Sequence, residues 1–103
     1  MFSHIMLGAN DIEQSKQFYD ATLGILGHAP GVMDPKGRCF YFTSTGVFAI
    51  TKPIDGKPAC KGNGSTIGFN AKSAEEVDAW HAAGIANGGV SCENPPGVRQ
   101  GTI

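Results

Sequence analysis

The stretch HIMLGANDIEQSKQFYDATLG, residues 4–24, decides the fold that we expect for this chain. Its first residues alternate between two sets of side chains, which is typical of a strand with two differently used faces. Ile5 and Leu7 belong to one set and are expected to pack under a helix, whereas His4 belongs to the other. The alternation predicts a strand over residues 2–9, with His4 on the face that points into a cleft.

A helix is expected directly after this strand. Asp11 can accept a hydrogen bond from the backbone of the first turn, and Gln14 three residues later completes a capping-box pattern. Apolar residues then recur at helical spacing up to Leu23, and Gly24 is a natural stop. The stretch therefore predicts a strand followed by an amphipathic helix.

Three more strands are expected, over residues 25–33, 38–44 and 47–52. The last two are rich in aromatic and β-branched residues and are separated by the tight-turn signal Thr45-Gly46. Alternation on the middle strand separates two faces, with Cys39, Tyr41 and Thr43 on one and Phe40 and Phe42 on the other.

The pattern restarts after a loop over residues 53–64, which is either a linker or a flap that faces a substrate. Residues 65–71 predict a strand, and Ser73 with Glu76 forms a second capping box before another helix. Residues 90–92 predict the start of one more strand. The second half thus repeats the order of the first.

The repeat is visible residue by residue, because Ile5 falls on Ile67 when the chain is slid along itself by 62 positions. We expect a single domain with module one at 1–52, a linker at 53–64 and a partial module two at 65–103, whose sheets line a shared cleft. Two strands of the second module are missing by symmetry. We therefore expect the whole protein to be about 20 residues longer, since an open module leaves an unpaired sheet edge.

Composition narrows the class of protein. The 103 residues suffice for one domain, and 41% apolar with 17% charged residues is typical of a globular chain. Eight basic and nine acidic residues give a net charge of −1, which disfavours nucleic-acid binding, and no apolar run is long enough to cross a membrane. Three cysteines without a CxxC pair and the lack of a signal peptide predict a cytoplasmic protein.

The opening stretch resembles the first module of the glyoxalase/bleomycin-resistance/extradiol-dioxygenase superfamily, the vicinal oxygen chelate proteins. The matching positions are His4, Asp11, Ile12, Ser15, Phe18, Tyr19, Leu23 and Gly24. The second half, with the later NPPGVR, is similar to a glyoxalase-like bacterial subgroup. The resemblance implies an α+β fold of paired βαβββ modules, the second incomplete in this chain.

The resemblance also implies a divalent metal (zinc, nickel or iron) held by His and Glu residues on the first and last strands of each module. His4 matches the first ligand, but Thr66 stands at its repeat mate and Ala49 at the expected carboxylate position. A fourth ligand would lie beyond Ile103. Because such metals need at least three protein ligands, a complete site is disfavoured, and Cys39 reads better as a small buried hydrophobe than as a replacement ligand.

Four residues are candidates for contact with a small molecule: His4, Tyr41, Thr66 and Arg99. His4 is interpreted as a remnant metal ligand, a general base or a polar group satisfied by a neighbour. Arg99, in the turn PPGVR, either closes on an anionic substrate or is a solvated loop charge. The sequence identifies no catalytic residue.

Two function classes stay open. One is a glyoxalase-like enzyme, a lyase or isomerase of the lactoylglutathione-lyase type, with His4 at the metal or as a base. The other is a metal-free protein of the bleomycin-resistance type that sequesters an apolar or aromatic molecule, which Thr66 and Ala49 favour. We expect a homodimer in either case, because two such modules usually need a partner to complete a deep cleft.

Overall fold

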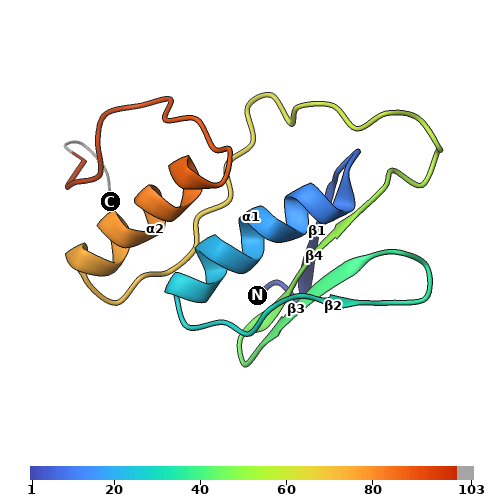
Figure 1. Cartoon of the computed structure of the whole chain (residues 1–103), viewed down its shortest axis with the longest axis horizontal. Coiled ribbons are helices and arrows are strands. Elements are labelled where there is room, and N and C mark those ends of the chain that lie inside the picture. The colour runs from blue at the N-terminus through green and yellow to red at the C-terminus, as the bar shows by residue number, and fades with distance from the viewer. Residues whose placement is uncertain (100–103) are drawn as a thin grey trace.

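The computed structural model describes residues 1–99. Its elements follow in the order β1 (His4–Gly8), α1 (Ile12–Ile25), β2 (Val32–Met33), β3 (Cys39–Thr43), β4 (Gly46–Thr51) and α2 (Ala74–Ala86). The strands form one sheet in the order β1-β4-β3-β2, and α1 and α2 lie side by side (Figure 1). Within these residues, no helix has the length and apolar character needed to span a membrane.

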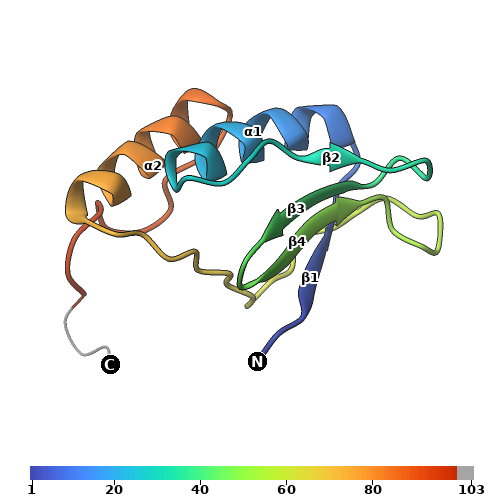
Figure 2. The same ribbon diagram turned by 90° about the horizontal axis from the view of Figure 1, so that it is seen from below.

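The first half of the chain is a βαβββ unit, as predicted. β1 runs parallel to β4, with Ile5 opposite Phe48, whereas β3 runs antiparallel to both β2 and β4. A parallel pair needs a crossover connection, and α1 supplies it by lying across one face of the sheet (Figure 2). The other face of the sheet is left open.

The predicted start of α1 is confirmed, and its end lies slightly later than predicted. Asp11 Oδ1 accepts a hydrogen bond from the backbone N–H of Gln14 at 3.0 Å. The helix passes Gly24 and the chain turns at Gly27, whose φ of +93° favours glycine. The strand expected over residues 25–33 is therefore wrong for most of its length: the helix and its turn take up the first part, and only Val32–Met33 pair with β3.

Residues 65–71 pair with no strand among the described residues, so the strand predicted there is wrong. A strand exists only where its backbone pairs with a neighbour, and among the described residues every paired strand comes from the first half of the chain. Ile67 and Phe69 are half-buried while Thr66 is exposed, so the alternation is present without the pairing. The strand start predicted at residues 90–92 is likewise not formed.

The core lies between the sheet and α1. Its most buried members include Leu23 from α1 and Cys39, Tyr41 and Ile50 from the sheet. The second predicted cap is present, since Ser73 Oγ accepts a hydrogen bond from the Glu76 N–H at 3.1 Å, but α2 contributes no fully buried residue. The first half of the chain therefore supplies nearly all of the core.

Candidate ligand-binding site

The sheet face opposite α1 presents side chains from β1, β4 and β3, and we call it the open face. The register places His4, Val47 and Phe42 in one row across the strands, and Met6, Ala49 and Phe40 in the next. Phe42 is 62% exposed, whereas Ala49 is 0% exposed because the larger Met6 and Phe40 flank it. The open face thus offers an exposed apolar surface.

Two phenylalanines and an arginine form a stack along β3. The Phe40 and Phe42 rings lie 5.7 Å apart between centroids at an interplanar angle of 14°. The Arg38 guanidinium carbon lies 5.0 Å from the centroid of Phe40, and Arg38 Nε donates to Asp34 Oδ2 at 2.7 Å. The hydrogen bonds from Arg38 lower the pKa of the Asp34 carboxyl. A cation is thereby held over Phe40, the half-buried member of an aromatic pair whose other ring, Phe42, is exposed.

His4 lies on β1, across the open face from Arg38, and its Nδ1 is 2.8 Å from Ser3 Oγ. The position at which a carboxylate ligand was expected, Ala49, shares this face but provides no oxygen. Among residues 1–99, no three His, Cys, Asp or Glu side chains lie close enough to hold a metal ion. Because zinc and similar ions need at least three protein ligands, the described donor set does not fit a divalent metal.

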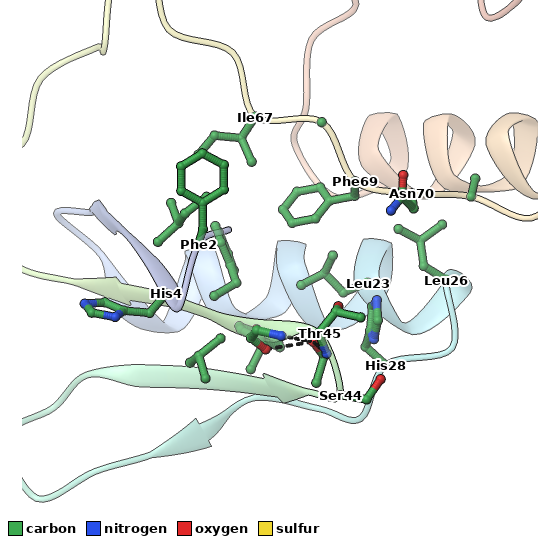
Figure 3. Close-up of a pocket in the computed structure, with 18 of the residues that line it drawn as sticks. Phe2, His4, Leu23, Leu26, His28, Ser44, Thr45, Ile67, Phe69 and Asn70 are labelled. Carbon is green, nitrogen blue, oxygen red and sulfur yellow. Dashed lines mark hydrogen bonds between the residues drawn. The ribbon is translucent and has the colours of Figure 1, made fainter.

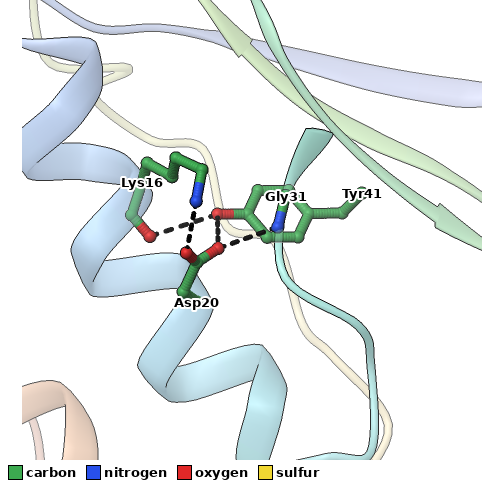
Figure 4. Close-up of polar contacts among 4 residues, drawn as sticks. All are labelled: Lys16, Asp20, Gly31 and Tyr41. Carbon is green, nitrogen blue, oxygen red and sulfur yellow. Dashed lines mark hydrogen bonds and ion pairs between the residues drawn. The ribbon is translucent and has the colours of Figure 1, made fainter. Parts of the chain in front are cut away.

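Tyr41 lies on the helix side of the sheet and not on the open face. Its side chain is 1% exposed, and its hydroxyl donates to Asp20 Oδ1 at 2.8 Å and lies 3.2 Å from the Lys16 carbonyl (Figure 4). Burial and the hydrogen bond to Asp20 both raise the pKa of Tyr41. The hydroxyl is therefore hydrogen-bonded inside the protein, on the sheet face opposite His4, and contact of Tyr41 with a substrate stays a prediction.

The carboxylate of Asp20 joins three parts of the chain, and sequence reasoning missed it. It accepts from Gly31 N–H at 2.8 Å and Lys16 Nζ at 2.6 Å, in addition to Tyr41. Burial acts to raise the pKa of Asp20, but these hydrogen bonds outweigh it and lower the pKa. Only the i, i+4 spacing of Lys16 and Asp20 was visible in the sequence. The network fixes β3, and with it Phe40 and Phe42, against α1.

Thr66 and Arg99 do not join His4 in one site. Thr66 is exposed within the unpaired residues 65–71. The guanidinium of Arg99 donates to the carbonyl oxygens of Pro95 at 2.8 Å and Asn94 at 2.9 Å, within its own turn. Neither Thr66 nor Arg99 is therefore part of a site with His4.

A cavity of about 510 Å³ lies on the helix side of the sheet (Figure 3). It is bounded by the sheet, the end of α1 and residues 67–72. His4 and Tyr41 border it, but the His4 ring points away from the side chains that gather around Phe69 (Figure 3). The open face and the cavity are therefore two different candidate surfaces.

Comparison with known proteins gives a consistent result. Residues 1–102 match the family model described as the Glyoxalase/Bleomycin resistance protein/Dioxygenase superfamily. The chain is similar to a crystal structure of a glyoxalase/bleomycin resistance protein from Albidiferax ferrireducens T118, with 61% identity and a TM-score of 0.93. That match covers 98% of this chain and 81% of the other. No curated protein matches the chain at a significant level.

Proposed function

Because the chain belongs to the Glyoxalase/Bleomycin resistance protein/Dioxygenase superfamily, we propose that it binds a small, flat, mainly apolar molecule on the open face. The observation that carries this proposal is the stack of the exposed Phe42 on the half-buried Phe40, with Arg38 at its end. Large exposed aromatic groups on one sheet face are costly to leave in water, so their coverage by a ligand is favourable. The protein then acts by binding or sequestering the molecule.

The open face sets the size and orientation of this ligand. Arg38 directly precedes β3, four residues before Phe42, and His4 lies on β1 in the row of Phe42. With a rise of about 3.4 Å per residue and about 4.8 Å between strands, the Cα atoms of His4 and Arg38 are roughly 16 Å apart. A flat molecule of one to three rings fits between the imidazole and the guanidinium. Each ring contact contributes about 0.5–1.5 kcal/mol beyond the buried area.

A lyase of the lactoylglutathione-lyase type is the other candidate. It is favoured by His4 alone, which stands on the open face at the position of the first expected metal ligand. The described residues offer that metal one imidazole and no carboxylate beside it. Assay of lactoylglutathione formation from methylglyoxal and glutathione, with added Ni²⁺ or Zn²⁺, separates the two candidates, because turnover with either metal contradicts a purely binding role.

Binding to the open face is tested with Phe42 variants. We expect 2-naphthoate or anthracene-2-carboxylate to bind saturably by calorimetry, and Phe42→Ala to weaken the binding about tenfold or more. Phe42→Leu keeps an apolar side chain and should fall between the two. Ile54→Ala is the matched control, since Ile54 is fully exposed in the 53–64 loop. If neither compound binds, or if Phe42→Ala binds as tightly as the wild type, the open face is not the site.

A further inference from the structure

We propose that the cavity on the helix side of the sheet is a second binding site, for a neutral, mainly apolar molecule with one hydrogen-bonding end. Its volume of about 510 Å³ falls within the range of about 300–1,000 Å³ typical of small-molecule sites. The cavity exists because residues 67–72 pass over the end of α1 without pairing with the sheet (Figure 3). This site goes beyond the proposed function, which concerns the opposite face.

The two surfaces lie mainly on opposite sides of the sheet, and they meet where His4 and Val47 of the open face border the cavity. Ile5 and Phe48 line the cavity, and they are neighbours in the register of β1 and β4. Side chains alternate between the two faces of a strand, so Ile5 points away from the face that carries His4. A molecule in the cavity therefore does not contact the stack of Phe40 and Phe42.

The side chains that line the interior of the cavity are mainly apolar, which favours a ligand whose larger part is apolar. Leu23, Leu26 and Phe48 are buried and form its floor, and Phe69 closes it from the other side. The Phe69 ring meets Phe48 edge to face, with centroids 5.3 Å apart and an interplanar angle of 87°. Walls of this kind favour transfer of apolar surface from water by about 25 cal/mol per Å². Ile67 completes the apolar lining.

The polar groups of the lining favour a neutral ligand. Lys72 and Glu76 line the cavity with opposite formal charges, and the backbone N–H of Lys72 donates to Glu76 Oε1 at 3.2 Å. The formal charges of these two side chains sum to zero, so they offer an ionic headgroup no net counter-charge, and such a headgroup bears a desolvation cost. His28, Ser44 and Asn70 also line the cavity and offer hydrogen bonds instead (Figure 3). One hydroxyl or carbonyl on the ligand matches this set.

Methyl NMR on the intact chain tests the site with a matched pair of probes. At pH 8, 2-naphthalenemethanol should shift the methyl signals of Leu23, Leu26 and Ile67 saturably. The anionic 2-naphthoate should act on the same signals about tenfold more weakly or not at all. Absence of saturable shifts with the alcohol, or equal affinity of the two probes at these methyls, overturns the proposal.

A filling substitution gives an independent test. Ile67→Trp places a larger side chain in the cavity and should weaken binding of the alcohol about tenfold or more. Ile54→Trp adds the same ring at a fully exposed position and should leave the affinity unchanged. Undiminished binding by Ile67→Trp contradicts the proposal. If that variant does not fold, the methyl shifts of the wild type decide.

Discussion

Removal of a single hydroxyl group tests the network that fixes β3 against α1. In Tyr41→Phe, Asp20 loses the hydrogen bond donated to Oδ1 at 2.8 Å but keeps those from Gly31 N–H and Lys16 Nζ. A hydrogen bond to a charged acceptor contributes about 1.5–3 kcal/mol. Because the Asp20 side chain is 27% exposed and water replaces part of the lost bond, we expect the free energy of unfolding to fall by about 1–2 kcal/mol.

Urea unfolding followed by the fluorescence of Trp80, the only tryptophan, measures this change. Tyr19→Phe is the matched control. Tyr19 is partly buried, and this burial raises its pKa, but its hydroxyl makes no hydrogen bond with the described residues. We expect the control to change the free energy of unfolding by less than about 0.5 kcal/mol. If Tyr41→Phe costs no more than Tyr19→Phe, the network does not stabilise the fold as argued.

The same network predicts the direction of a pH effect. The pKa of Asp20 is lowered in the folded protein, so its ionised carboxylate stabilises the fold above the ordinary pKa and loses this effect as pH falls through the folded pKa. Wild type should therefore exceed Asp20→Asn in free energy of unfolding at pH 7, and the difference should shrink as pH falls below about 4. A difference that stays constant down to pH 3 would refute the assignment of this charge.

Four further predictions concern two glycines, a helix cap and assembly. Gly31→Ala should cost several kcal/mol or prevent folding, because an added Cβ would lie 2.3 Å from Cys39 Sγ. Gly24→Ala has open space around it in α1 and should raise the free energy of unfolding by about 0.5–1 kcal/mol in thermal unfolding. Asp11→Ala removes the cap on the Gln14 N–H and should cost about 1 kcal/mol in urea unfolding; no change would mean that the cap is dispensable. The predicted homodimer is checked by light scattering after gel filtration, where a monomeric mass at all concentrations would contradict it.

Part of the candidate site was predictable and part was not. Alternation along β3 correctly separated Tyr41 from Phe40 and Phe42, and alternation along β1 correctly placed His4 opposite Ile5. Period two says which residues share a face of their own strand, but not which faces of different strands coincide. The register that puts Ile5, Phe48 and Tyr41 on one face is a long-range property. The sequence therefore favoured Tyr41 as a cleft residue, whereas in the structure Phe40 and Phe42 are the β3 residues that lie on the open face.

The amino-acid sequence by itself determined the family, the βαβββ order of the first half and the caps of both helices, because these depend on residues that are near one another in the chain. Only the tertiary structure decided that α1 covers the face of Tyr41, that Asp20 binds it, and that residues 65–71 stay unpaired in the described chain. Pairing and burial need a partner that is distant in sequence, and no local pattern specifies which partner arrives.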